Sequence, residues 1–292
     1  MLGIILINYN SEKELVHYVK NELVKIGYPH IIAIVNNSHS LSSKNTLSKS
    51  FINDPKFQLD KNIFIIDAAS NLGYAKANNL GAMFLADRFN IEYLLFTNSD
   101  IILTDKDVVE SLISKAETDE KIGVIGPRIV GENGKDQSPI MFIPPIKYLA
   151  KYLIKPLINK IIKKSRHTSS DNTFNTPQEG FYYTVSGCFI LVKAAVFLSA
   201  GKFDPETFLY SEERILSERI NKTGNKFYYY PEVSILHYEN TTTLRSFKIP
   251  ELRSFLFDSE YYYYTKYIIS NPLVLLIFNL IKYHRNIKKT IQ

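Results

Sequence analysis

The segment YLLFTNSDIIL, residues 93–103, decides the fold class, because it joins a short apolar strand to a polar turn. A short apolar run bounded by polar residues is typical of a strand that is buried on both faces of a sheet. The same pattern recurs upstream, and helical patterns fill the intervals between the strands. We expect strands at Gly3–Ile7, His30–Val35, Asn62–Ile66 and Glu92–Phe96, and helices at Ser11–Ile26 and Leu72–Arg88.

This alternation of strands and helices predicts an α/β fold with a doubly wound, mostly parallel sheet. In such sheets ligands bind outside the carboxyl ends of the strands. Polar triplets follow the strands directly, at Asn8-Tyr9-Asn10, Asn36-Asn37-Ser38 and Asn98-Ser99-Asp100. We therefore expect the chemistry of the protein to lie at this edge of the sheet.

The second half of the chain is less regular. Prolines and a basic composition at residues 137–178 indicate an irregular insertion or loop. Order resumes beyond it, and the last fifty residues look helical and rich in tyrosine. We expect strands at Tyr182–Val192 and Lys226–Leu236, and helices at Ala194–Ala200 and Glu212–Lys222.

The bulk composition indicates a packed protein without disulfides. Hydrophobic residues make up 45% and charged residues 22% of the 292 residues, and Cys188 is the single cysteine. The start of the chain lacks the pattern of a signal peptide. The late apolar run Leu273–Ile281 is too short to cross a bilayer core of roughly 30 Å. These features predict a cytoplasmic location.

The net charge of +6 is concentrated in two segments. Residues 137–170 carry seven Lys or Arg and no acid, and residues 261–292 carry five more and no acid, which leaves the rest at −6. Lys147, Lys151 and Lys155 recur every four residues among apolar ones. This spacing suits a helix on an anionic membrane surface, or equally one packed on its own domain or on a dimer partner. Nucleic-acid binding has the least support, because no recognised nucleic-acid module accompanies the charge.

Four side chains have the chemistry of an active site. Asp100, at the tip of an apolar strand, could bind a hard cation, although a turn aspartate has the same position. Glu212 or Glu213 could be a general base that a helix N-terminus keeps ionised, or could only complement the helix dipole. His237 ends a strand and could be a metal ligand or a hydrogen-bonded structural residue.

Asparagines and glycines frame the expected helix at 72–88. The sequences Asn71-Leu72-Gly73 and Asn78-Asn79-Leu80-Gly81 could bring the backbone close to a nucleotide. They could equally form a turn and a close helix-packing contact. The residues alone leave both interpretations open.

The order of these motifs resembles glycosyltransferase family 2, and within it the bacterial rhamnosyltransferases and the capsule and O-antigen transferases. The resemblance covers most of residues 1–240. It rests on INYNSEKEL near the start, NLGYAKANNLGA at 71–82, YLLFTNSDIIL at 93–103, and the long block VSGCFILVKAAVFLSAGKFDPETFLYSEERILSERINKTGNKFYYYPEVSILHY at 185–238.

The resemblance implies a GT-A fold and a set of site residues. Asp100 would hold a metal and the donor diphosphate, Glu213 of the tandem acid Glu212-Glu213 would be the catalytic base, and His237 would lie near the metal. The positions around the nucleotide would be Asn8, Tyr9, Asn10, Asn36, Asn71, Gly73, Asn79, Asn98 and Ser99.

The implied activity is an inverting transfer of a sugar from a nucleotide-diphosphate donor, UDP- or dTDP-linked, with Mn²⁺ or Mg²⁺. The acceptor would be a saccharide, lipid-linked at the cytoplasmic membrane face, in bacterial surface polysaccharide biosynthesis. Residues 1–240 would form the catalytic domain and 241–292 a helical extension. Two positions depart from the family: Asn36 replaces an aspartate that contacts the base, and Glu213 replaces a second acid that is commonly aspartate.

Two other classes of function stay open at this point. A sugar nucleotidyltransferase shares the sheet and the metal, but it normally needs a glycine-rich basic loop that INYNSEKEL lacks. A non-catalytic GT-A-like scaffold or carbohydrate-binding subunit would need none of the acids, yet Asp100 and both tandem glutamates are present. The sequence contains neither GxxxxGK nor GxGxxG, so ATPase and dinucleotide redox functions have no support.

Overall fold

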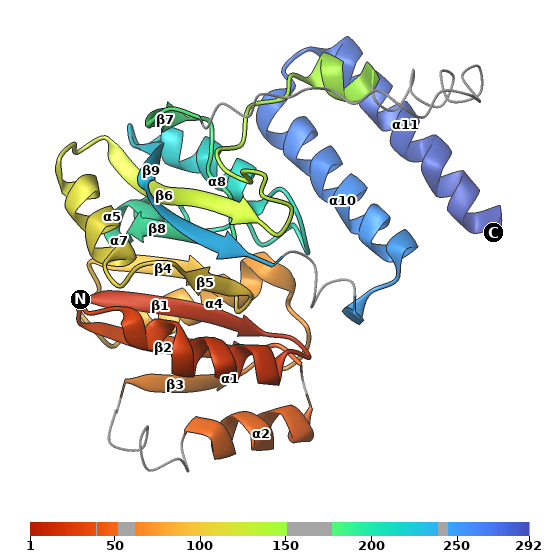
Figure 1. The fold of residues 1–292 in the computed structure, drawn as a ribbon. Coiled ribbons are helices and arrows are strands. Elements are labelled where there is room, and N and C mark those ends of the chain that lie inside the picture. The colour runs from red at the N-terminus through yellow and green to blue at the C-terminus, as the bar shows by residue number, and fades with distance from the viewer. Residues whose placement is uncertain (39, 52–61, 151–176, 239–244, 292) are drawn as a thin grey trace.

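The structure is a computed structural model that describes residues 1–38, 40–51, 62–150, 177–238 and 245–291. Strands and helices alternate through the first half, and helices form the C-terminal end (Figure 1). The strands are β1 Leu2–Asn8, β2 His30–Asn36, β3 Ile63–Asp67, β4 Tyr93–Thr97, β5 Ile101–Leu103, β6 Ile122–Gly131, β7 Gly180–Tyr182, β8 Phe189–Lys193 and β9 Lys226–His237. The helices are α1 Glu12–Asn21, a 3₁₀ turn Leu23–Lys25, α2 Leu41–Phe51, α4 Gly73–Ala86, α5 Val108–Glu117, α7 Ala194–Ser199, α8 Glu212–Asn221, α10 Ile249–Tyr263, a π-helical turn Tyr264–Ile268 and α11 Pro272–Ile291.

All the named strands belong to a single sheet with the order β3-β2-β1-β4-β8-β6-β9-β5, and β7 pairs with β9. The first four are parallel, and the register aligns the ends of β1, β2 and β3 at Asn8, Asn36 and Asp67. Beyond β4 the sheet is mixed, with β8 antiparallel to both neighbours and β6 parallel to β9. The parallel half therefore presents its carboxyl ends at one edge, as the sequence predicted.

The predicted alternation is confirmed, with differences at particular elements. The expected strand Tyr182–Val192 is wrong as one element, because the chain leaves β7 at Tyr182 and enters β8 only at Phe189. The loop between them carries Gly187 into the site described below. The helix expected at Ser11–Ile26 ends at Asn21 and continues as a 3₁₀ turn. Helix α2 and strands β5 and β6 were not predicted.

A buried hydrophobic layer lies on each face of the sheet. One lies under α1, α2 and α5, and the other lies on the opposite face under α4, α7 and α8. Strand β4 contributes to both faces, with Leu95 in one layer and Phe96 in the other. This double burial accounts for the continuous apolar run at residues 93–96.

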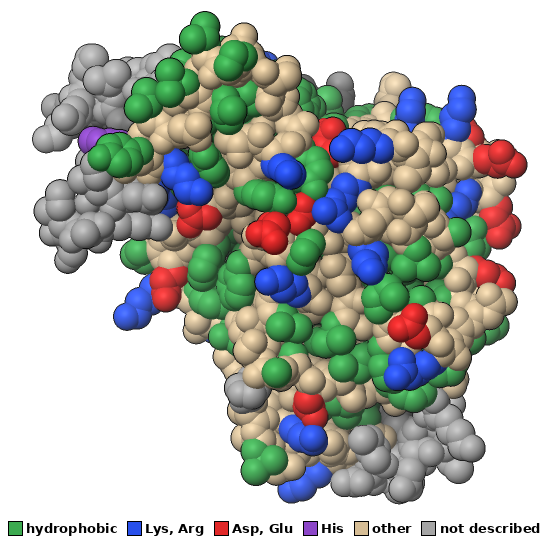
Figure 2. Space-filling view, turned by 180° about the vertical axis from the view of Figure 1, so that it is seen from behind, with side chains coloured by type: hydrophobic (Ala, Val, Ile, Leu, Met, Phe, Trp, Pro, Cys, Tyr) green, Lys and Arg blue, Asp and Glu red, His purple; other side chains and the backbone are tan. Residues whose placement is uncertain are grey.

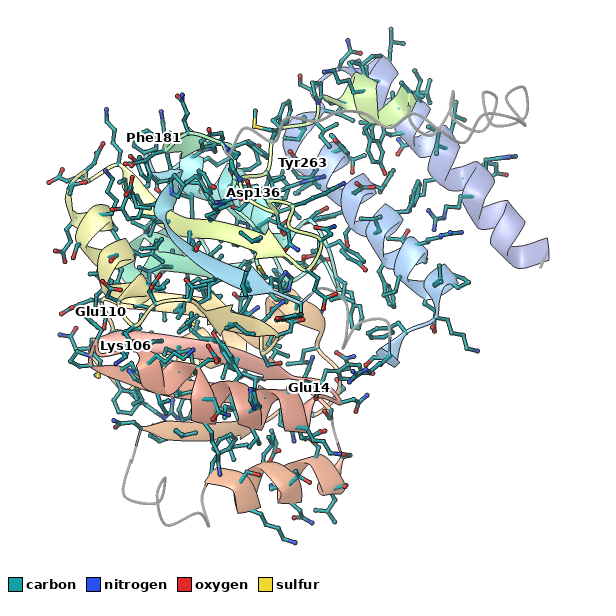
Figure 3. All side chains as sticks on the ribbon, in the orientation of Figure 1. Glu14, Lys106, Glu110, Asp136, Phe181 and Tyr263 are labelled. Carbon is teal, nitrogen blue, oxygen red and sulfur yellow. The ribbon has the colours of Figure 1, made fainter. Side chains whose placement is uncertain are left out.

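The C-terminal helices form a separate small core. Tyr263 and Tyr264 pack with Tyr148 and Phe278, which joins α10 and α11 to the helical residues 145–150. Figure 3 shows Tyr263 on the side of α10 that faces the sheet, where its hydroxyl group contacts that of Tyr183. The helical character expected for this end is confirmed. Most of the basic pattern at 147–164 lies outside the described residues.

Candidate active site

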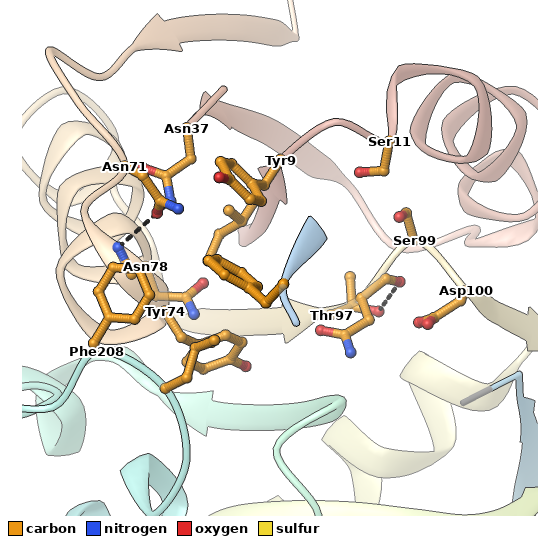
Figure 4. Close-up of a pocket in the computed structure, with 15 residues that line it drawn as sticks. Tyr9, Ser11, Asn37, Asn71, Tyr74, Asn78, Thr97, Ser99, Asp100 and Phe208 are labelled. Carbon is orange, nitrogen blue, oxygen red and sulfur yellow. Dashed lines mark hydrogen bonds between the residues drawn. The ribbon is translucent and has the colours of Figure 1, made fainter. Parts of the chain in front are cut away.

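A pocket opens at the carboxyl ends of β1, β2 and β4 (Figure 4). Its cavity volume is about 160 Å³, and asparagine and aromatic side chains dominate its wall, so we name it the asparagine pocket. Tyr9 and Phe247 stack on one side, with ring centroids 5.5 Å apart and an interplanar angle of 16°. The lining consists of Ile7, Tyr9, Ser11, Asn37, Asn71, Gly73, Tyr74, Asn78, Thr97, Asn98, Ser99, Asp100, Phe208, Leu209 and Phe247.

Backbone and amide contacts fix the wall near α4. Asn37 donates from Nδ2 to Asn71 Oδ1 at 2.8 Å, and its own Oδ1 accepts from the Leu72 backbone N–H at 2.8 Å. Gly73 has a φ of +74°, and a Cβ atom there would lie 2.4 Å from the carbonyl oxygen of Phe208. Only glycine tolerates both the conformation and this approach. Gly73 therefore allows the loop that carries Phe208 to close one side of the pocket.

Asp100 and His237 meet because β5 and β9 are antiparallel neighbours. Ile101 pairs with His237 in this register, and Asp100 precedes Ile101. His237 Nε2 lies 3.3 Å from Asp100 Oδ1, and both side chains are largely buried. On its other side His237 Nδ1 contacts Gln137 Oε1 at 2.6 Å. The two candidate metal ligands named from the sequence thus lie together.

The protonation of His237 bears on this role. Burial lowers the pKa of His237, but contacts with Asp100 and Cys188 raise it more strongly, to about 10. A metal ion binds the neutral imidazole, so His237 must release this proton if it becomes a ligand. Asp100 Oδ1 is buried and has no hydrogen-bond partner among the described residues. This oxygen faces the protonated His237 ring at 3.3 Å, so a cation bound to it would replace that contact.

A second pocket adjoins the first and shares Tyr74, Asn98 and Leu209 with it. Its cavity volume is about 360 Å³, and three carboxylates line it, so we name it the glutamate pocket. Tyr74 lies at the junction, where its hydroxyl group donates to the Gly187 carbonyl at 2.8 Å. The full lining is Tyr74, Asn98, Ser186, Gly187, Cys188, Leu209, Tyr210, Ser211, Glu212, Glu213, Arg214, Leu256 and Glu260.

An unusual backbone conformation aims the tandem acid at this pocket. Tyr210 and Ser211, directly before α8, have φ values of 77° and 68°. Consecutive non-glycine residues in this region cost about 1–3 kcal/mol each, and such strain gathers at functional sites. The turn places both Glu212 and Glu213 in the wall of the pocket, in the first turn of α8.

The two glutamates differ in their environments. Glu212 is 5% exposed, and burial together with the charge of Glu213 raises the pKa of Glu212 to about 8. Glu213 is half-buried, and burial raises its pKa despite its backbone hydrogen bond and the nearby Arg214. At Glu212 desolvation therefore outweighs the helix N-terminus, which was expected to keep a carboxylate ionised; for Glu213, the predicted base, that expectation stays a prediction.

The structure divides the sequence-predicted nucleotide residues into two groups. Asn8, Asn10, Asn36 and Asn79 lie outside the lining of the asparagine pocket. Asn8 donates to Asn36 and Ser43 in a buried network, and Asn79 holds the Phe203 backbone through both its amide atoms. The predicted residues that line the pocket are Tyr9, Asn71, Gly73, Asn98, Ser99 and Asp100.

Several lining residues were not named as site residues from the sequence. Asn37 is adjacent to the named Asn36 and belongs to the polar triplet that the sequence places after this strand. Tyr74 and Phe208 lie within the quoted motifs at 71–82 and 185–238. Phe247 and Glu260 come from the C-terminal end, where no sequence motif signals a contact with the sheet edge.

The chain is similar to known proteins over much of its length. The N-acetylglucosaminyl-diphospho-decaprenol L-rhamnosyltransferase of Mycobacterium tuberculosis is 23% identical over 191 residues, which is 63% of this chain and 61% of the relative. Alignments to the first curated relatives span between 38% and 61% of those relatives' own lengths. The chain therefore corresponds to only part of them.

Solved structures share the fold. S. aureus TarS 1-349 in complex with UDP-GlcNAc superimposes with a TM-score of 0.57 at 15% identity, over 95% of this chain and 71% of that one. The mannosyltransferase PcManGT from Pyrobaculum calidifontis in complex with GDP-Man and Mn²⁺ gives 0.55 at 12% identity, over 96% and 73%. These likenesses confirm the expected GT-A fold.

A family model decides the family. The model described as glycosyl transferase family 2 matches residues 3–161, which include β1 to β6, Asp100 and the asparagine pocket up to Asp100. The match covers more than half of the 292 residues. This protein therefore belongs to glycosyl transferase family 2.

Proposed function

We propose that this protein is an inverting glycosyltransferase. It takes a sugar from a UDP- or dTDP-linked donor and transfers it to an acceptor saccharide, lipid-linked, in bacterial surface polysaccharide biosynthesis. The observation that carries the proposal is the pair of adjoining pockets. One holds Asp100 and the other holds Glu213, and Tyr74 and Asn98 line both. A donor and an acceptor bound in the two pockets would meet at that shared wall.

The asparagine pocket suits the nucleotide. Its aromatic pair Tyr9 and Phe247 offers apolar ring faces against which a base can lie. Asparagine amides supply donors and acceptors for base and ribose without adding charge. A diphosphate would extend toward Asn98, Ser99 and Asp100, at the end of β4.

The residues at the end of β4 fit a divalent cation. Among the described residues no group of three or more His, Cys, Asp or Glu side chains could hold a metal. Asp100, with His237 beside it, is a sparse donor set of the kind that Mg²⁺ or Mn²⁺ completes with substrate phosphates and water. The bound ion would neutralise charge on the departing diphosphate.

Glu213 is the better candidate for the base. The base must be ionised when the acceptor binds, and Glu212, with a pKa of about 8, is protonated at neutral pH. Glu213 is more exposed, and its raised pKa brings it closer to neutrality, where a general base works best. Glu213 removes the proton from an acceptor hydroxyl, and the oxygen attacks the anomeric carbon from the face opposite the diphosphate.

The lipid-linked acceptor has two supports. The mycobacterial relative is named for a decaprenol-linked substrate. In this chain, α11 exposes a stripe of apolar side chains, namely Leu273, Leu276, Ile277, Leu280 and Tyr283. Figure 2 shows hydrophobic side chains at the surface of the lobe that these C-terminal helices form.

The partner that we propose for this stripe is an anionic membrane surface, because residues 261–292 carry five Lys or Arg and no acid. Among the described residues, no helix is long and apolar enough to span the membrane, so the contact would be peripheral. We expect the protein to co-sediment with phosphatidylglycerol vesicles and not with phosphatidylcholine ones. Leu276→Ser with Leu280→Ser weakens this binding about tenfold or more.

The control for this experiment is Leu41→Ser. Leu41 is 74% exposed on α2, distant in sequence from α11, and its substitution should leave vesicle binding unchanged. Equal loss in both variants, or binding that ignores lipid charge, contradicts the membrane contact. A stable dimer that the α11 substitutions dissociate would assign the stripe to a second copy of the chain.

The test of the proposed activity is calorimetric binding of UDP, dTDP, GDP and ADP, with and without Mn²⁺. We expect one nucleotide to bind in a metal-dependent manner, and Asp100→Ala to weaken that binding at least about tenfold, or ~1.4 kcal/mol. Asp105→Ala is the matched control, since Asp105 is exposed five residues away and lines neither pocket. No binding of any nucleotide to folded protein rejects the transferase and favours a scaffold.

A further inference from the structure

The glutamate pocket has an unbalanced charge. Glu212 and Glu213 enter it from α8, and Glu260 enters it from α10. Among the described residues of the lining, Arg214 is the only cation. The family resemblance accounts for the tandem pair on α8, but it does not extend to residue 260.

Glu260 is held firmly in this position. It is 5% exposed, and Arg214 Nη1 forms an ion pair with its Oε1 at 3.8 Å. The adjacent Ser259 donates from Oγ to the Leu209 carbonyl at 2.7 Å. Leu209 lines both pockets, so this bond fastens α10 to the wall that the two pockets share.

A buried carboxyl oxygen in the same pocket has no hydrogen-bond partner among the described residues. This oxygen is Oε1 of Glu212, a residue that is 5% exposed. A buried carboxyl oxygen of this kind is stabilised when a ligand supplies a hydroxyl group, which can both donate and accept a hydrogen bond. An anionic ligand group would bring a like charge close to Glu213 and Glu260.

We propose that α10 completes the acceptor site: Glu260 binds hydroxyl groups of the acceptor saccharide, and the pocket selects an uncharged sugar over one that carries a carboxylate. This inference rests on the proposed transferase function. It makes Glu260 a specificity-determining residue that the C-terminal extension supplies. Leu256, one helical turn before Glu260, lines the same pocket and offers an apolar contact for the sugar ring.

The experiment compares sugars that differ only at C6. Saturation-transfer NMR measures binding of p-nitrophenyl β-glucoside and β-glucuronide, and of the corresponding galactoside and galacturonide. The protein is held with Mg²⁺ and the nucleotide that calorimetry has identified. We expect the neutral member of at least one pair to bind about tenfold more tightly than its acidic partner. Glu260→Gln weakens the neutral sugar several-fold and shrinks the preference, while nucleotide affinity stays unchanged.

Asp258→Asn is the matched control. Asp258 is an exposed acid on the same helix that lies outside the lining of the pocket, and the variant should behave as wild type. Equal binding of neutral and acidic partners, or binding of neither, overturns the inference, as does a Glu260→Gln variant with an unchanged preference. If no nucleotide binds, the proposed transferase function is contradicted and not the inference about Glu260. The two failures are therefore distinguishable.

Discussion

The asparagine pocket and the glutamate pocket share a wall but differ in their charge. The asparagine pocket is lined by amides and aromatic rings, and Asp100 is the carboxylate among its described lining residues. The glutamate pocket is lined by three carboxylates and Arg214. A diphosphate brings its own negative charge, which repels acids unless a cation lies between them. The difference supports the proposal that the anionic donor binds on one side of Tyr74 and an uncharged acceptor on the other.

The pockets also differ in where their residues come from. The asparagine pocket is built mainly from strand ends and from the start of α4, within the part of the chain that the family model covers. The glutamate pocket draws on α8 and α10 beyond that part. Under the proposed function, donor recognition is tied to the sheet, whereas acceptor recognition depends on later helices that can vary independently.

The largest expected effect is a loss of turnover, without a loss of nucleotide affinity, when the glutamate pocket is altered. Glu213→Gln keeps the shape of the side chain but removes its basicity, so we expect the turnover rate to fall by about 10²–10⁴. Nucleotide affinity should stay within about twofold of wild type, because Glu213 does not line the asparagine pocket. Steady-state kinetics and calorimetry on the same preparation measure both quantities.

Glu212→Gln is the comparison for this experiment. Since Glu212 is protonated at neutral pH, glutamine imitates its native state, and turnover should change by less than about tenfold. If Glu212→Gln abolishes turnover while Glu213→Gln spares it, the roles of the two acids are reversed. A variant of Glu213 that loses nucleotide binding would mean that the pockets are not separate.

Much of the fold was predictable because it depends on local patterns. The apolar runs at β1, β2 and β4 are buried on both faces and that of the edge strand β3 is partly buried, and all four were predicted as strands without any alignment. Helix α2 was missed since its sequence LSSKNTLSKSF has few apolar residues, and only Ser43, Leu47 and Phe51 are buried. The strand at 182–192 was misjudged because hydrophobicity alone does not show where a chain leaves a sheet.

The site was predictable only where it follows a strand or a known motif. Asp100 and His237 meet through the pairing of β5 with β9, and the short strand Ile101–Leu103 was not predicted. Glu260 was missed because a single glutamate in a tyrosine-rich helix carries no local signal. Its place depends on how α10 packs on the sheet, which is a tertiary property.

The smallest expected effect concerns stability and tests the burial of Glu212. Its folded pKa of about 8 exceeds the ordinary value of 4.5, so the folded state holds a proton that the unfolded state has already released. Stability from this group is therefore fully present below about pH 4.5 and is lost as the pH rises toward 8. Burial opposes the ionisation of this carboxyl group most strongly, and the charge of Glu213 adds to the effect.

A glutamine at position 212 cannot ionise, so the Glu212→Gln variant does not lose this stability as the pH rises. We expect the variant to gain on the order of 3 kcal/mol over wild type between pH 5 and pH 8, in urea unfolding followed at several pH values. The difference between the two curves isolates Glu212, because the other titrating groups are common to both proteins. Parallel curves would mean that Glu212 ionises in the fold as it does in water. The glutamate pocket would then carry a full charge from each of its acids, and the contrast in protonation between Glu212 and the base Glu213 would disappear.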